Sequence, residues 1–179
     1  PTDLRSLPMP SSDWLDGVAS PNPPRKVAWS PTMGFSPVDD EVRALCEAAV
    51  ARLERAGTEV VEVDTVWHED PVVSWFGLTA VATYRTLRDF ERTPEWEGID
   101  AGLREQMAYG KDHVAAPDVL GAMDLAHRLT VALVELFHDV DYLLPPTCAG
   151  QTPAPGEFGT INGHPDVNWV RFTYGFNMT

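Results

Sequence analysis

The stretch DVDYLLPPTCAGQTPAP, residues 139–155, decides the fold that the sequence predicts. Its centre, Tyr142-Leu143-Leu144, is a short apolar run, and Pro145-Pro146 ends it. Such a run between turn signals is typical of a buried strand, and proline cannot continue the interior of a sheet. The loop that follows would leave the carboxyl end of the strand, where open α/β sheets bind their ligands. We therefore expect this loop to reach a site, although no Ser–Lys pair, Ser–His pair, Gly-rich loop or ligand cluster lies near it.

A βαβ unit is predicted upstream of this strand. The segments RKVAWSP (25–31) and TEVVEVD (58–64) alternate apolar and polar residues, which is typical of strands. Between them, Val38-Asp39-Asp40-Glu41 places acidic residues in the first turn of a helix, and Gly57 supplies its stop. A strand, a helix and a strand in about 40 residues predict a parallel pair with a right-handed crossover.

Apolar periodicity predicts three further helices. The first covers residues 71–92 and the second covers residues 99–109, with a break between them and a stop at Gly110. The third and longest covers residues 119–138, and Asp118 is expected to cap it.

Two segments are expected to be irregular. Residues 1–24 are rich in proline and predict an extended linker, in which Ser11-Ser12 would cap a helical turn before Trp14. Residues 149–168 are rich in glycine and proline, and a turn is expected at Ile161-Asn162-Gly163. The glycines of this second segment lack the GxGxxG order of dinucleotide sites.

Composition limits the class of function. The chain has 179 residues, 44% of them hydrophobic, and a net charge of -14, which fits one globular domain. A nucleic-acid backbone and an anionic membrane surface both attract clustered Lys and Arg, so neither is an expected partner. No secretory signal and no run of about 18 apolar residues is visible, and we expect a cytoplasmic protein.

Metal and thiol chemistry are not expected. Cys46 and Cys148 have no metal-ligand spacing, and the five histidines are not paired in the sequence. A nucleophilic Cys148 would need a histidine or a cation to activate it, and none is nearby in the sequence. We therefore predict no metal, no cofactor and no cysteine hydrolase.

Five segments, taken in their order, resemble the C-terminal half of the amidase signature family. They are KVAWSP (26–31), PVDDEV (37–42), GTEVVEVD (57–64), VDYLLPPT (140–147) and FTYGFNMT (172–179). The resemblance covers most of residues 25–179 and implies an α/β fold, with part of a mixed central sheet covered by helices. In the last segment, five residues match the part of the family that enters the next core strand: Phe172, Thr173, Phe176, Asn177 and Thr179.

The family resemblance also implies an activity. Family members hydrolyse or transfer amides through an acyl-enzyme, with a serine nucleophile activated through a second serine and a lysine. These catalytic residues belong to a Gly/Ser-rich signature in the N-terminal half of the family, and this chain has no such signature. Ser11-Ser12 lacks the flanking glycines of the family. Neither Lys26 nor Lys111 has the neighbouring sequence of the catalytic lysine. The resemblance therefore implies no catalytic residue in this chain. Because the chain opens on Pro1 and closes on Thr179 within a motif, we expect a piece of an amidase whose partner is the remainder of the chain.

Three residues are predicted to contact substrate. Family members that use free glutamine carry an arginine and an aspartate that hold the amino acid, and these align with Gln106 and Val170. Neither of these side chains can pair with an α-carboxylate or an α-ammonium, so the resemblance implies a neutral or apolar amide as the substrate. Trp75, on the predicted helix 71–92, either lines the same pocket or fills the core.

A second hypothesis needs no catalysis. The βαβ unit of residues 25–64 can form a self-contained α/β module that binds a small ligand, which would explain the missing catalytic groups.

Overall fold

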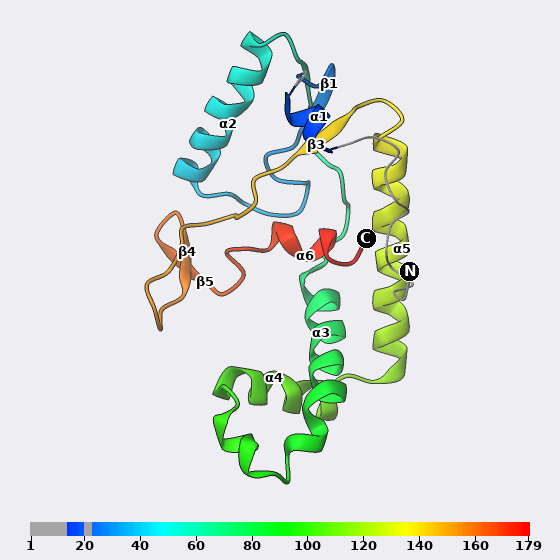
Figure 1. Ribbon diagram of the computed structural model, residues 1–179, viewed down its shortest axis with the longest axis vertical. Helices are drawn as coiled ribbons and strands as arrows, with labels where there is room; N and C mark the ends of the chain where they lie inside the picture. The colour runs from blue at the N-terminus through cyan, green and yellow to red at the C-terminus, as the bar shows by residue number, and fades with distance from the viewer. Residues whose placement is uncertain (1–13, 20–22) are drawn as a thin grey trace.

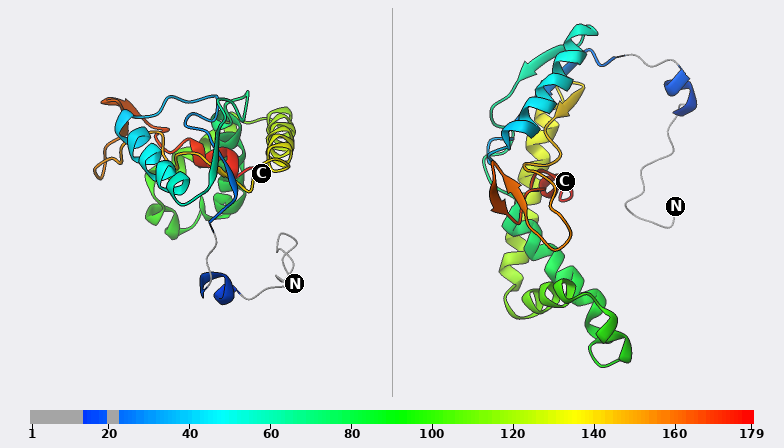
Figure 2. Two further views of the ribbon diagram at one scale, coloured as in Figure 1. Left: turned by 90° about the horizontal axis from the view of Figure 1, so that it is seen from above. Right: turned by 90° about the vertical axis from the view of Figure 1, so that its left-hand side faces the viewer.

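The computed structural model describes residues 14–19 and 23–179. Most of the predicted linker, including Ser11-Ser12, lies outside the described residues. Within it, Trp14–Ala19 form a short helix, α1, whose residues 15–19 are exposed. Figure 1 shows a small sheet at one end, the helices α3 and α4 at the other, and α5 running beside α3 and towards the sheet. Figure 2 shows the same body from the side, where it is elongated.

The sheet has three parallel strands in the order β2-β1-β3. They are β1 (Lys26–Trp29), β2 (Glu59–Glu62) and β3 (Tyr142–Leu144). Ala28 lies opposite Val61 on one side and Leu143 on the other. Val27 and Ala28 are completely buried, as expected for the central strand of a covered sheet. The three predicted strands are confirmed, as is the parallel pairing predicted for the first two, β1 and β2.

The crossover helix α2 (Asp40–Arg55) begins and ends where the sequence predicts. Asp39 is its N-cap, and the carboxylate accepts a hydrogen bond from the backbone N–H of Glu41 at 3.1 Å. Gly57 follows the helix with φ of 97°, a left-handed conformation that glycine adopts without strain.

The long helices differ from prediction at their ends. They are α3 (Val72–Leu87), α4 (Ala101–Asp112) and α5 (Ala116–Leu136), with short 3-10 helices η1 (Arg88–Phe90) and η2 (Pro94–Gly98) before α4. Gly110 does not stop α4, which continues to Asp112. The glycine serves packing instead, because a Cβ at this position would collide with the backbone of Ala80 in α3. Asp118 lies inside the first turn of α5, and its carboxylate accepts a hydrogen bond from the N–H of Ala115 at 2.8 Å.

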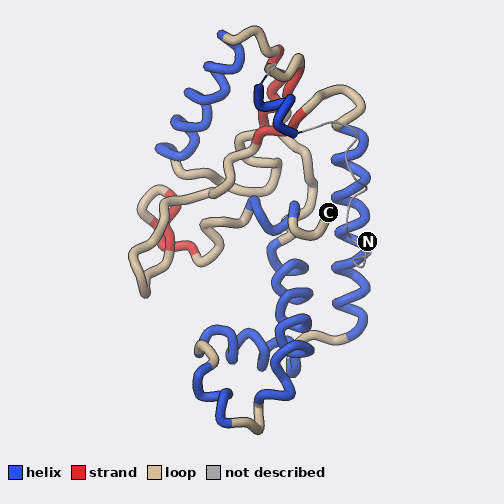
Figure 3. Tube along the Cα trace, in the orientation of Figure 1, coloured by secondary structure: helices blue, strands red, loops and turns tan. Residues whose placement is uncertain are grey.

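Residues 149–168 contain a hairpin that the sequence does not predict. Strands β4 (Gly159–Ile161) and β5 (His164–Asp166) pair antiparallel, separately from the main sheet (Figure 3). The predicted turn is confirmed, since Asn162 and Gly163 have φ of 50° and 79°, the conformation of a tight hairpin turn. The strands were missed because each has three residues and β5 contains Pro165.

The last segment ends in a short helix. Residues Phe172–Phe176, which belong to the segment that the resemblance places before the next core strand, form α6. Phe172 and Tyr174 are buried, so these residues serve the core from a helix. In Figure 1, α6 crosses the middle of the molecule between the hairpin and α5.

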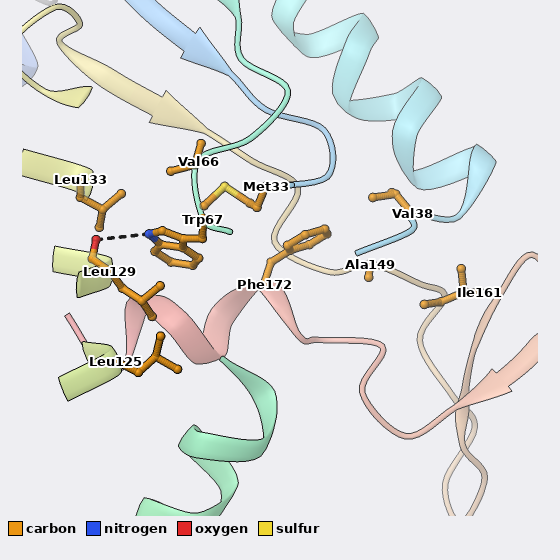
Figure 4. Close-up of a cluster of buried hydrophobic side chains, with 10 residues drawn as sticks. All are labelled: Met33, Val38, Val66, Trp67, Leu125, Leu129, Leu133, Ala149, Ile161 and Phe172. Carbon is orange, nitrogen blue, oxygen red and sulfur yellow. Dashed lines mark hydrogen bonds between the residues drawn. The ribbon is translucent and has the colours of Figure 1, made fainter. Parts of the chain in front are cut away.

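One hydrophobic cluster joins these parts (Figure 4). Trp67, which is 1% exposed, is central, and its indole N–H donates to the carbonyl of Leu129 on α5 at 3.2 Å. The ring of Trp67 also packs against Phe35 and against Phe176 of α6, with ring centroids 6.1 and 4.9 Å apart. The loop after β2, the helix α5 and α6 are therefore held by the same contacts.

Candidate functional site

The helix α6 has a shallow hollow on each side. The first, here called the strand-end hollow, has a volume of about 240 Å³ and is mostly apolar. Its lining residues are Pro145, Pro146, Thr147, Phe172, Thr173, Phe176 and Asn177. It begins directly after β3, which is where the sequence predicted that the chain reaches a site.

The second hollow, here called the aromatic hollow, has a volume of about 290 Å³. Its lining comes from α3, α4, the segment after β5, and α6: Trp75, Phe76, Gln106, Val167, Asn168 and Tyr174. None of these six side chains carries a charge at neutral pH. Pockets that combine aromatic walls with a few polar groups are typical of small-molecule sites.

Trp75 is half-buried and is a wall of the aromatic hollow. Its ring stacks on Tyr174 with centroids 4.1 Å apart and planes 8° apart, so contact with α6 fixes the ring orientation. Burial raises the pKa of the Tyr174 phenol, which therefore stays neutral at physiological pH. Phe76 is 38% exposed, and its ring packs on Tyr109 with centroids 5.2 Å apart.

Gln106, on α4, also lines the aromatic hollow. Its Nε2 donates to Oγ1 of Thr79 at 3.2 Å. The Thr79 hydroxyl in turn donates to the carbonyls of Trp75 and Phe76, at 3.1 and 3.0 Å. The two predicted residues Trp75 and Gln106 are therefore 31 positions apart in sequence but belong to one connected arrangement.

Val170 lines neither hollow. It is half-buried just before α6, and its carbonyl accepts hydrogen bonds from the backbone N–H and the Oγ1 of Thr173, at 3.0 and 2.9 Å. The structure therefore brings two of the three predicted residues together and leaves Val170 at the start of the helix that carries Tyr174.

Sequence reasoning missed Asn168 and Tyr174. Asn168 lies in a segment held by the ion pair between Asp166 and Arg171, whose charged atoms are 2.8 Å apart and largely buried. The N–H of Asn168 donates to Asp166 at 2.7 Å, which fixes its backbone beside the hollow. The only sequence signal for Tyr174 was its place in FTYGFNMT, and Tyr174 was not among the residues of that segment that matched the family.

The described residues carry no evident catalytic group at either hollow. Burial raises the pKa of the Cys148 thiol, which disfavours the thiolate that a cysteine nucleophile requires. Within residues 14–19 and 23–179, no three His, Cys, Asp or Glu side chains are grouped as metal ligands would be.

No helix in the described part of the chain is long and apolar enough to cross a membrane.

Comparison with known sequences gives the family. A profile of the family described as Amidase matches residues 1–178. An amidase from Pseudomonas putida is 27% identical over 189 residues, which cover 100% of this chain and 39% of that protein. An acylamidase from Rhodococcus erythropolis is 29% identical over 161 residues, which cover 86% of this chain and 33% of that protein. The chain thus spans well under half the length of these relatives.

Solved structures share the fold. A bacterial aryl acylamidase of the amidase signature family has a TM-score of 0.67 and 21% identity, over 87% of this chain and 35% of that one. A 6-aminohexanoate cyclic dimer hydrolase has a TM-score of 0.75 and 20% identity, over 99% of this chain and 41% of that one. These matches confirm the α/β fold and the predicted resemblance. The chain belongs to the Amidase family.

Proposed function

We propose that this chain is part of an amidase that hydrolyses uncharged amides through an acyl-serine intermediate. The match of the family profile to residues 1–178 carries the proposal. In this proposal the chain contributes part of the sheet, the helices that cover it and part of the substrate pocket. The remainder of the amidase contributes the nucleophilic serine, the second serine and the lysine.

The chemistry assigns this chain a binding role. The serine oxygen attacks the amide carbonyl carbon, the C–N bond breaks, and the amine leaves after taking up a proton. Water then hydrolyses the acyl ester, which releases the acid and restores the serine. Neither hollow offers a nucleophile or a base for these steps, so we assign Trp75 and Gln106 to holding the non-reacting part of the substrate. Val170 would affect the substrate only indirectly, because it precedes α6, the helix that carries Tyr174 into the lining of the aromatic hollow.

The preference for an uncharged amide has two supports. The lining of the aromatic hollow has no charged side chain, so the hollow offers no partner for an α-carboxylate or an α-ammonium. Two relatives are also described as acylamidases, one of them an aryl acylamidase.

A second candidate is a small-ligand-binding module without catalysis. It is supported by the aromatic hollow, because all six of its lining residues come from this chain. Under either candidate, a cytoplasmic location stays a prediction.

A fluorophosphonate that labels activated serines separates the two candidates. The protein is purified from its source, treated with the probe, and weighed intact, with heat-denatured protein as the control. We expect one label on a chain well above 19.7 kDa, the mass of these 179 residues. An unlabelled chain of 19.7 kDa would contradict the amidase proposal and favour the binding module.

A further inference from the structure

We propose that the aromatic hollow binds an uncharged aromatic group that carries a hydrogen-bond donor, with Trp75 as the stacking wall and the Gln106 carbonyl oxygen as the acceptor. Asn168 is a third specificity residue that no sequence signal indicated. The inference rests on the proposed amidase function for what happens to the ligand afterwards. The binding itself can be measured without any reaction.

The aromatic lining of the hollow favours a flat ligand. Trp75, Phe76 and Tyr174 place three aromatic rings in its lining. Trp75 cannot rotate freely, because its ring lies parallel to that of Tyr174 at 4.1 Å and Tyr174 is buried. A ring that is held in advance binds another ring at little cost in side-chain entropy.

The hydrogen bonds around Thr79 fix how Gln106 is oriented. The single hydroxyl hydrogen of Thr79 points to the carbonyls of Trp75 and Phe76 in the same helix. Towards Gln106 the hydroxyl can therefore only accept, so the Gln106 side chain must present its NH₂ group to Thr79. Its carbonyl oxygen, Oε1, accepts no hydrogen bond from the described residues and is left to accept one from a ligand.

Asn168 offers a second carboxamide at the same hollow. Its backbone is fixed on both sides, by the N–H donated to Asp166 at 2.7 Å and by its carbonyl, which accepts from the Arg171 guanidinium at 3.3 Å. Its side-chain amide makes no hydrogen bond to the described residues, and a carboxamide can both donate to and accept from a ligand.

The charge near the hollow is already neutralised. Arg171 is the nearest cation in sequence to Asn168, and it pairs with Asp166 at 2.8 Å, with both side chains mostly buried. A ligand carboxylate would have to compete with Asp166 for this guanidinium. A ligand cation would find no carboxylate in the lining, and cation–π attraction to the aromatic faces would have to offset the whole loss of its hydration. A neutral ligand loses less hydration on entering the hollow, so the hollow favours a neutral ligand.

The experiment compares three small probes on the full-length protein by titration calorimetry. Phenylurea is flat, neutral and resistant to hydrolysis, and it carries N–H donors. Phenylguanidine has nearly the same shape but is a cation at neutral pH, and cyclohexylurea has the same donors without an aromatic ring. We expect phenylurea to bind most tightly. Cyclohexylurea should be weaker by about tenfold, the size of one lost stacking contact. Phenylguanidine should also be weaker, because its charge loses hydration in a lining that has no carboxylate.

Matched variants assign the binding to these residues. Trp75→Leu should weaken phenylurea about tenfold, and the control Trp96→Leu, an indole outside the hollow, should leave it unchanged. Gln106→Glu should reverse the preference towards phenylguanidine, because a carboxylate pairs with the guanidinium. The control Glu105→Gln changes one charge on the same helix and should leave the order of the probes unchanged. Asn168→Ala should weaken both phenyl probes.

The outcomes separate this inference from the amidase proposal. Phenylurea binding that depends on Trp75 and Gln106 supports the inference even if no serine is labelled by fluorophosphonate. The inference is overturned if the protein is a labelled, active amidase that binds all three probes equally. It is also overturned if Trp75→Leu and Gln106→Glu leave probe binding unchanged. In both cases the amidase proposal is still supported. Circular dichroism of each variant shows whether a loss of binding reflects unfolding, and in that case Trp75→Phe replaces Trp75→Leu and should retain the preference for phenylurea over cyclohexylurea.

Discussion

The sheet end and the helical arm of the molecule are packed in different ways. The sheet end consists of β1, β2, β3 and α2, and its central strand is sealed, with Val27 and Ala28 completely buried. The helical arm consists of α3, α4 and the first half of α5. There α3 is more apolar than α2, yet it has no more buried residues than α2: each helix has one, Ala80 in α3 and Val50 in α2. The contrast suggests that the sheet end provides rigidity, while the arm leaves aromatic surface available where α6 reaches it.

Removing the Trp67 side chain should destabilise the sheet end and the helical arm together, and we expect it to cause the largest loss of unfolding free energy. Trp67 is 1% exposed and belongs to a buried cluster that contains Met33 and Val38, between β1 and α2, and Leu125, in the first half of α5. Trp67→Ala would leave a large cavity and remove the indole hydrogen bond to the Leu129 carbonyl, and truncation of a buried tryptophan costs about 3–5 kcal/mol of unfolding free energy. Urea unfolding followed by circular dichroism measures the loss.

The control for Trp67 is Trp96→Ala. Trp96 lies in η2, outside the cluster around Trp67, and its half-buried ring is covered by the guanidinium of Arg104 in α4. An equal loss in the two variants would mean that the cluster around Trp67 does not join the two regions.

A single methyl group at Gly110 should break the arm and spare the sheet. A Cβ at this position would collide with the backbone of Ala80, where α4 packs on α3. Because backbone cannot move aside as a side chain can, Gly110→Ala should cost about 1–3 kcal/mol. Hydrogen exchange should show faster exchange in α3 and α4 and unchanged protection in β1.

Gly121→Ala is the matched control in α5, where nothing lies within 4 Å of an added Cβ. There the higher helix propensity of alanine should stabilise the protein by up to about 1 kcal/mol. If both glycine variants were stabilised, the close approach of α3 and α4 would not be a constraint on the fold.

The two regions also differ in how well the sequence predicts them, because the strands of the sheet end have local signals and the close packing of the arm does not. The strands β1 and β3 were predictable because apolar runs end at Pro31 and Pro145, and these are local signals. Gly110 was misjudged as a stop because its reason, the backbone of Ala80, lies 30 residues away. The strands β4 and β5 escaped notice because three residues are too few to show a period of two.

The candidate site was half predictable for a related reason. The family resemblance pointed to Gln106, and a bulky aromatic on an apolar helix pointed to Trp75. The position of Asn168 depends on the ion pair between Asp166 and Arg171, and that of Tyr174 depends on α6 being a helix. Neither dependence has a local signature, so these two residues required the three-dimensional structure.

A smaller effect is expected at Asp39, which ties the sheet end to the hairpin. Its carboxylate accepts hydrogen bonds from Asn162 N–H at 2.8 Å and from Gln151 at 2.9 Å, as well as from Glu41. These bonds, led by that from Asn162, hold the pKa of Asp39 below its ordinary value. The charged form is therefore favoured in the folded state, and its contribution to stability is present above about pH 4 and is lost as the pH falls through the folded pKa.

Asp39→Asn should therefore lower the urea midpoint at pH 7, and the gap to the wild type should narrow below about pH 4. Asp40→Asn is the control, since Asp40 adjoins the same helix terminus and its side chain makes no hydrogen bond to the described residues. A gap that stays constant from pH 7 to pH 3 would mean that the charge of Asp39 does not hold the hairpin.

The smallest effect is expected where the loop between β2 and α3 meets α5. The Arg128 guanidinium donates two hydrogen bonds to the Glu69 carboxylate, at 2.8 and 2.9 Å, and lowers the pKa of Glu69. Both side chains are about half exposed, so water and salt weaken the pair. Arg128→Gln should shift the urea midpoint only slightly at low salt and not at all at 1 M salt. The control is Arg85→Gln, which removes an exposed arginine that has no ion pair to the described residues. It should leave the urea midpoint unchanged at both salt concentrations. A large shift that survives high salt would mean that this pair, rather than the buried cluster around Trp67, holds the arm against the sheet end.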